Sequence, residues 1–259
     1  MSSTPTRYPS GVATRFVDHL YGSFPRPDPF QVWQFTDDFN GFTVSSSTTT
    51  GWHLDEIDTN TAGTGPTMLD EFGGVVQFEP GSAAGDNCHY QLANNTTIYE
   101  PVKLVAGKRA WFSTCFSIED ADQNLFFIGC HIGADDILGT EPSDQFGVRS
   151  KPSTPGTMQF CAGKTNSTEA VSGDLVTIAD STRYAVYAFY DGKDTIAVQV
   201  YTYASDVFTL VANGSVTVTS SSAGDLLPDT EMTIGFAIEA VDTGNDKLQL
   251  DWIHVARER

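Results

Sequence analysis

Acidic side chains and two cysteine–histidine dipeptides are the residues of this 259-residue chain whose types and spacing could do chemistry. Glu56-Ile57-Asp58 begins a Glu-x-Asp-x-x-Glu pattern, whose first two carboxylates share one face of a strand. Retaining hydrolysis of a glycosidic bond needs two carboxyl groups about 5–5.5 Å apart. The third position here is Thr61, so the acid is missing, and we interpret the pattern as a chance match.

Metal binding is the second chemistry to consider. Cys88-His89 and Cys130-His131 carry suitable ligands, but adjacent residues of a strand point to opposite faces, so neither pair presents both ligands together. The C-x₂-C spacing of structural zinc is absent. The acidic stretches 119–122 and 135–136 could bind calcium through their oxygens, yet neither has an EF-hand pattern. We therefore predict no metal, no cofactor and no catalytic residue.

Cysteine usage supports the same view. Cys88, Cys115, Cys130 and Cys161 lie in or near apolar runs and lack the close spacings of a disulfide framework. We expect buried, reduced thiols, and disulfides are the alternative.

The elements that carry these residues are predicted to be strands. The last two apolar runs, Glu231–Glu239 and Leu248–Val255, flank turn residues and predict a terminal hairpin, with a bulge or a doubly buried strand at Trp252-Ile253. Asp191-Gly192 predicts a hairpin turn between Tyr184–Tyr190 and Thr195–Tyr201. Asn213-Gly214 predicts a second one. With about a dozen strands and no alternation of strands and helices, we predict an all-β, antiparallel β-sandwich.

A proline- and aromatic-rich leader precedes this β pattern. We divide the chain into an extended N-terminal arm over residues 1–36, in which only Val12–Tyr21 could form a short helix, and a sandwich domain over residues 37–259. Apolar residues that cannot form their own core must pack on another surface. That surface is the arm's own domain or a partner subunit. For the partner, the expected anchors are the large apolar side chains of the arm: Tyr8, Phe16, Leu20, Tyr21 and Phe24.

The net charge of the chain limits the classes of partner that we expect. The net charge is −19; three arginines against two aspartates give residues 1–36 a charge of +1, so the rest carries −20. An acidic surface disfavours nucleic acid, because phosphate binding needs clustered Lys and Arg. No apolar run approaches ~20 residues, so no membrane partner is expected.

Short motifs along the chain resemble those of concanavalin A/laminin-G-like jelly rolls: Asp37–Gly41, Phe189–Lys193, Leu227–Asp229 and Leu250–Val255. The resemblance implies that the first and last strands lie together in one sheet. Tyr8–Val12 and the closing Val255–Arg259 resemble tailed-bacteriophage virion proteins, some of which are similar to capsid decoration, or cement, proteins.

This second resemblance implies a non-enzymatic function. Such a protein binds the major capsid protein on the outer capsid surface of the virion, often as a trimer, and stabilises contacts between capsomers after assembly in the host cytoplasm. The alternative is a carbohydrate-binding module of a tail or host-recognition structure, for which Trp52, Trp111 and Tyr201 are candidate aromatic platforms. An unusual glycoside hydrolase is a third option.

Overall fold

The computed structural model describes twelve stretches of the chain, and of residues 50–55, 64–65, 94, 219–220 and 224–225 it describes the backbone alone. The stretches are 21–39, 50–55, 64–69, 74–94, 97–133, 137–138, 144–151, 153–164, 170–205, 207–220, 224–243 and 247–259. Across them the chain is almost entirely β, with one 3₁₀ turn at Ala121–Gln123. Within these stretches no helix is long and apolar enough to cross a membrane.

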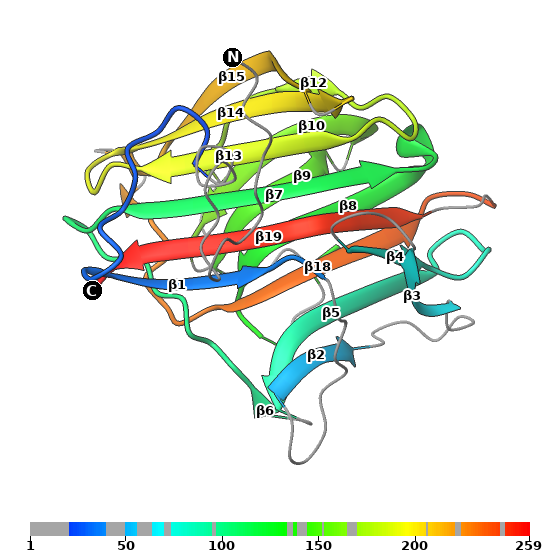
Figure 1. Cartoon of the computed structure of the whole chain (residues 1–259), viewed down its shortest axis with the longest axis horizontal. Coiled ribbons are helices and arrows are strands. Elements are labelled where there is room, and N and C mark those ends of the chain that lie inside the picture. Colours follow the sequence, from blue (N-terminus) through cyan, green and yellow to red (C-terminus); the bar gives the residue numbers. More distant parts are fainter. Residues whose placement is uncertain are drawn as a thin grey trace.

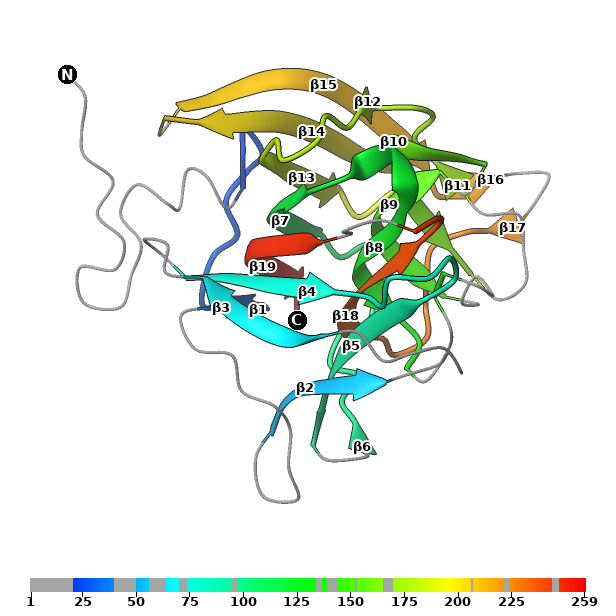
Figure 2. The same cartoon turned by 90° about the vertical axis from the view of Figure 1, so that its right-hand side faces the viewer.

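Two large antiparallel sheets form the predicted sandwich, and Figure 2 shows them side by side as layers. Sheet A has the order β15-β14-β13-β7-β19-β4-β3, with β1 also paired to β19 (Figure 1). Its strands are β1 (Val32–Asp37), β3 (Thr64–Leu69), β4 (Val75–Glu79), β7 (Ala110–Ile118), β13 (Tyr184–Tyr190), β14 (Thr195–Ala204), β15 (Val207–Thr217) and β19 (Leu248–Glu258).

Sheet B has the order β11-β10-β9-β8-β18-β5-β2, with β12 paired to β10 and β6 to β5. Its strands are β2 (Thr50–Asp55), β5 (Asn87–Asn94), β6 (Thr97–Ile98), β8 (Asn124–His131), β9 (Gln145–Lys151), β10 (Thr154–Gly163), β11 (Ala170–Val171), β12 (Val176–Thr177) and β18 (Thr233–Ala240). A small separate pair joins β16 (Thr219–Ser220) to β17 (Gly224–Asp225).

The core lies between the two sheets and follows the period-two pattern of the strands. On β18, Ile234, Phe236 and Ile238 all point into it. The Phe236 ring lies 4.5 Å from that of Phe78 on β4, so the aromatic packing crosses from one sheet to the other. Burial of this kind contributes about 25 cal/mol per Å² of apolar surface and is the main stabilising term of a sandwich.

The first and last described strands pair with each other, as the jelly-roll resemblance implied. Val32 lies opposite Glu258 and Asp37 opposite Ile253. The expected boundary between arm and sandwich after residue 36 therefore falls inside β1, because residues 32–36 already belong to sheet A. Residues 1–20, with Tyr8, Phe16, Leu20 and nearly all of the possible helix, lie outside the described stretches.

The predicted terminal hairpin is wrong, because β18 and β19 belong to different sheets. β18 pairs with β5 and β8, and β19 pairs with β7, β4 and β1. Both strands are apolar enough to need a neighbour on each side, and the connection between them crosses from sheet B to sheet A. The bulge is confirmed: the register shifts between Leu250 and Trp252, and Ile253 then faces the core.

One of the two predicted internal turns is also wrong. β13 and β14 form the predicted hairpin, with Gly192 at φ +88° in the connection. Asn213-Gly214, by contrast, continues straight through β15 opposite Gln199 and Val198. The glycine leaves room for the Leu175 side chain, since a Cβ on Gly214 would lie 2.4 Å from it.

Candidate functional site

The outer face of sheet A, which points away from the core, divides into two halves. At one half lies an open pocket of about 270 Å³, which we call the polar pocket. It occupies the right-hand end of the sheet in Figure 1, where β19 begins and β7 ends beside β4. The polar pocket is lined by Gln77, Ser117, Glu119, Ser181, Lys247 and Gln249.

The floor of the polar pocket is one polar row across three strands. Gln249 on β19 lies opposite Gln77 on β4 and opposite Ser117 on β7. Each of the three sits between two core residues of its own strand, so the pleat turns it outward. The Ser117 hydroxyl donates to Gln249 Oε1 at 3.2 Å, and Gln249 Nε2 donates to Gln77 Oε1 at 3.1 Å.

An ion pair forms the rim. Lys247 Nζ lies 2.7 Å from Glu119 Oε2, and the Glu119 N–H donates to the Lys247 carbonyl at 3.0 Å. The hydrogen bond to Glu119 raises the pKa of the Lys247 ammonium. Ser181 closes the rim from the loop before β13, with φ +53° and its N–H bonded to the Ile118 carbonyl. The polar pocket thus combines two amides, two hydroxyls, one carboxylate and one ammonium.

This lining suits a small, neutral, highly hydroxylated ligand. Amides and hydroxyls both donate and accept, so they can match a ligand whose hydroxyl groups do the same. Pockets for drug-sized molecules typically measure about 300–1,000 Å³, so the volume here fits a ligand of about one ring. Glu119 is the one carboxylate in the lining and is already paired, so the pocket lacks the carboxyl pair of a glycoside hydrolase.

The other half of the outer face carries aromatic side chains and is covered. We call it the aromatic half; it comprises Trp111, Tyr187, Phe189, Tyr201, Phe208 and Trp252. The leader, residues 21–31, runs across it (blue in Figure 1). Trp111 Nε1 donates to the Pro25 carbonyl at 2.7 Å, and the Phe24 ring stacks on Phe189 with centroids 5.5 Å apart.

Two of the five predicted anchors can be placed, and both pack on their own sheet. Tyr21 is buried with its ring 5.2 Å from that of His254, and burial raises the pKa of its hydroxyl to about 12. Phe24 packs beside Tyr187 and Trp252. This matches the alternative in which the leader lies on its own domain. An interface role for Tyr8, Phe16 and Leu20 stays a prediction.

Two of the three candidate platform residues can be described: Trp111 is 1% exposed beneath the leader, and Tyr201 is half-buried on the same face. The side chain of Trp52, on β2, lies outside the described part of the structure, as do Glu56-Ile57-Asp58, Thr61 and residues 135–136.

The two Cys-His pairs split across sheet B as expected. Cys88 and Cys130 face the core, and all four cysteines of the chain are buried and free, as predicted. No pattern in the sequence, however, indicated that the outward histidines meet each other. His89 on β5 and His131 on β8 approach across β18, with their Nε2 atoms 3.2 Å apart.

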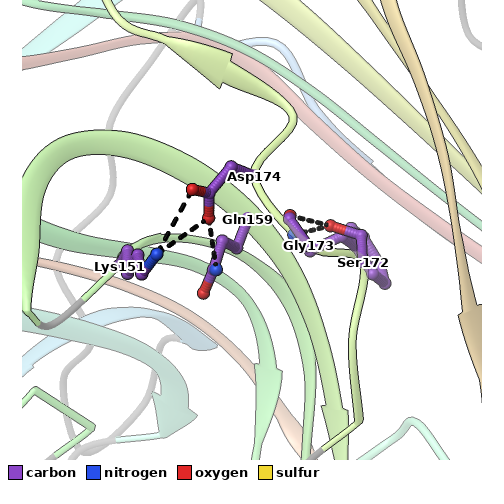
Figure 3. A network of polar contacts seen from close by, with 6 residues as sticks. Lys151, Gln159, Ser172, Gly173 and Asp174 are labelled. Atoms are coloured by element: carbon purple, nitrogen blue, oxygen red, sulfur yellow. Dashed lines mark hydrogen bonds and ion pairs between the residues drawn. The ribbon is translucent and has the colours of Figure 1, made fainter.

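Other aspartate side chains make contacts that hold nearby backbone segments in place. Asp120, Asp122 and Asp180 bring carboxylate oxygens within 4.8 Å of one another, and Asp180 Oδ1 accepts from the Ala121 N–H. Figure 3 shows a second cluster, in which Asp174 accepts from Gln159 Nε2 at 2.9 Å and lies 3.2 Å from Lys151 Nζ. These contacts, Gln159 first, lower the pKa of Asp174. They hold the loop between β11 and β12 onto β9 and β10.

Sequence reasoning missed the polar pocket as a site. The three-residue patterns Val76-Gln77-Phe78, Phe116-Ser117-Ile118 and Leu248-Gln249-Leu250 do signal an outward polar residue on each strand. They are separated by up to 172 positions, however, and strand order decides that they become neighbours.

Comparison with known proteins establishes the fold. No protein-family model and no curated protein matches the chain. A protein of unknown function from Shewanella oneidensis MR-1 matches with a TM-score of 0.56 at 16% identity, covering 99% of this chain and 97% of that one. Lectin II from Ulex europaeus gives 0.51 at 12% identity, covering 88% and 99%. A non-specific endo-β-1,3(4)-glucanase from family GH16 gives 0.52 at 11%, covering 91% and 95%. The chain therefore has a lectin-like jelly-roll sandwich fold.

Proposed function

We propose that this chain is a non-enzymatic carbohydrate-binding domain and that the polar pocket on sheet A holds one sugar unit. The observation that carries the proposal is the row Gln77–Gln249–Ser117, which presents donors and acceptors side by side in an open pocket of about 270 Å³. A pyranose ring presents neighbouring hydroxyl groups, and each of them both donates and accepts.

The rim adds specificity for neutral sugars. Lys247 and Glu119 lie 2.7 Å apart and offset each other's charge, and Glu79 also acts on Lys247, so the pocket offers no excess positive charge to attract an anionic ligand. Each retained hydrogen bond contributes about 0.5–1.5 kcal/mol, so three or four of them would give the weak affinity usual for a single sugar. A longer glycan would extend beyond the pocket.

The fold supports this proposal by analogy. A lectin and a glucanase share the sandwich, but fold alone does not define function, so the proposal depends on the pocket. Hydrolysis is the less favoured activity, since the pocket has one carboxylate and that group is ion-paired.

The capsid decoration role receives no support from the structural neighbours and stays a prediction. That prediction requires an arm that binds a neighbouring subunit. Residues 21–31 of the arm, however, lie on their own sheet. Virion location, trimer formation and binding to a major capsid protein are testable by adding purified protein back to bare capsids. Binding that is lost on deletion of residues 1–20 would favour the decoration role.

The sugar proposal is tested by screening the full-length chain on a glycan array and titrating the best ligand by calorimetry. Gln249→Ala removes the central residue of the row and should weaken binding by about tenfold or more. Gln34→Ala is the matched control, because Gln34 is an exposed glutamine of the same sheet, on β1. Equal affinities of the two variants, or no array signal for the wild type, would refute the proposal.

A further inference from the structure

The two outward histidines of sheet B meet at a glycine. Gly235 is the third residue of β18, and a Cβ there would lie 2.3 Å from His131 Nε2. His131 is opposite Thr233 and His89 is opposite Ala237, so the two side chains lean toward each other from opposite sides of Gly235. Glycine leaves the space in which the imidazole rings approach, with centroids 4.9 Å apart. Both histidines are buried.

Their separation is the one that a shared metal ion requires. The Nε2 atoms are 3.2 Å apart. Two histidine nitrogens bound to one tetrahedral zinc ion at about 2.0–2.1 Å lie about 3.3 Å from each other. The same distance also permits a direct N–H···N hydrogen bond, so the distance alone does not decide between the two arrangements.

The hydrogen bonding of His131 favours a ligand role. Its Nδ1 lies 2.7 Å from the Ile132 carbonyl, a contact in which the ring nitrogen must be the donor. The proton is thereby held on Nδ1, and the Nε2 lone pair points toward His89. A backbone carbonyl that fixes the far nitrogen is the usual support of a metal-bound histidine.

A neighbouring position can add to the coordination. Gln91 on β5 is buried and directly opposite Gly235, the residue over which the rings meet. An amide oxygen at this position is a suitable ligand, and water can fill an open position of a tetrahedral ion.

We propose that His89 and His131 form a binding site for one divalent transition-metal ion of the zinc type, with Gln91 as the further ligand position. Binding needs no net proton release: His89 moves its proton from Nε2 to Nδ1, and His131 already carries its proton on Nδ1. The ion would then tie β5 and β8 together across β18. This site lies on the opposite sheet from the polar pocket and is independent of sugar binding.

The test measures metal binding by the chelator-treated, full-length protein. Zn²⁺ should bind at one equivalent and raise Tm by about 5 °C at saturation. Co²⁺ should give the intense visible absorption of a tetrahedral site with nitrogen ligands. His89→Gln and His131→Gln should each weaken binding by about 100-fold or more, a larger loss than the 10–100-fold of a supporting residue. Gly235→Ala should also abolish binding, although it keeps both histidines, because the added methyl group occupies the ring's place.

His254→Gln is the matched control. His254 is equally buried and its pKa is lowered to about 4, but it pairs with Thr36 and not with another histidine. This variant should keep wild-type metal binding. The proposal is overturned if the wild type binds less than about one-tenth of an equivalent, as a directly hydrogen-bonded pair would. It is also overturned if binding survives in the His89 and His131 variants. Should those variants not fold, a weak, octahedral-type Co²⁺ spectrum of the wild type would overturn it.

Discussion

The two halves of the outer face of sheet A share strands but differ in exposure. The polar pocket is open to solvent, whereas the aromatic half is covered by the leader. On β19, Gln249 lies on the floor of the open polar pocket, while Trp252, just beyond the bulge, is buried beneath the leader. Both side chains point away from the core between the sheets. The difference shows that strand alternation determines which residues face outward, and that segments from elsewhere in the chain determine whether that face is exposed.

Among substitutions that test this difference in exposure, Trp252→Ala should have the largest effect. The indole is 1% exposed and packs with Cys115, Ala185 and Tyr187, so its removal leaves a cavity and should cost about 3–5 kcal/mol in the free energy of unfolding. Urea denaturation of wild type and variant measures the loss. A loss below about 1 kcal/mol in the free energy of unfolding would mean that the leader does not bury the aromatic half as a core.

The next largest effect should be a loss of folding stability in acid, caused by His254 in the aromatic half. Burial lowers the pKa of His254 from 6.5 to about 4, so between these values the unfolded chain binds more protons than the folded one. Stability should therefore fall as the pH is lowered from 6.5 to 4, by about 3 kcal/mol from this residue. The groups that face it are Thr36, Ser113 and Tyr21, and Tyr21 is uncharged throughout this range.

The measurement compares unfolding at pH 7 and at pH 4.5 for the wild type and His254→Gln. The variant should lose less stability on acidification. His131, buried on sheet B, adds a similar acid sensitivity that the variant retains. An unchanged pH dependence in the variant would show that His254 is hydrated.

A smaller effect is expected at the leader itself. Tyr21→Ala removes a buried ring from the surface of sheet A and should cost about 2 kcal/mol. Phe30→Ala is the control in the same segment, because Phe30 is 89% exposed and its loss should change stability by less than about 0.5 kcal/mol. Equal effects in thermal unfolding would contradict the packing of the leader described above.

The smallest change in the free energy of unfolding is expected for a substitution in the open polar pocket. Gln249→Ala should change the free energy of unfolding by less than about 0.5 kcal/mol, because its partners Gln77 and Ser117 can turn to water. Chemical denaturation measures this directly. A loss above about 2 kcal/mol would identify the row as a structural network and not as a binding surface.

The fold was largely predictable from the sequence because period-two patterns are local. Tyr184–Tyr190 and Thr195–Tyr201 carry both their alternation and their turn within eighteen residues. The errors arose where long-range contacts override local signals. Asn213-Gly214 has turn chemistry, yet the pair lies within a continuous strand, where the glycine leaves room for Leu175. Two consecutive apolar strands, β18 and β19, join different sheets because each needs two neighbours.

The candidate sites were much less predictable. Dipeptides 88–89 and 130–131 correctly indicated that cysteine and histidine point to opposite faces, but the meeting of the histidines depends on β18 lying between β5 and β8. The polar pocket likewise requires β4, β19 and β7 to be adjacent. Neither arrangement leaves a spacing signal in one sequence.

The most direct test of the central claim is a crystal structure of the chain with the best glycan from the array. Electron density for a sugar ring should lie over Gln77, Ser117 and Gln249, with the leader still in place over Trp111. A glycan found on the aromatic half with the leader displaced, or anywhere else on the molecule, would contradict the account.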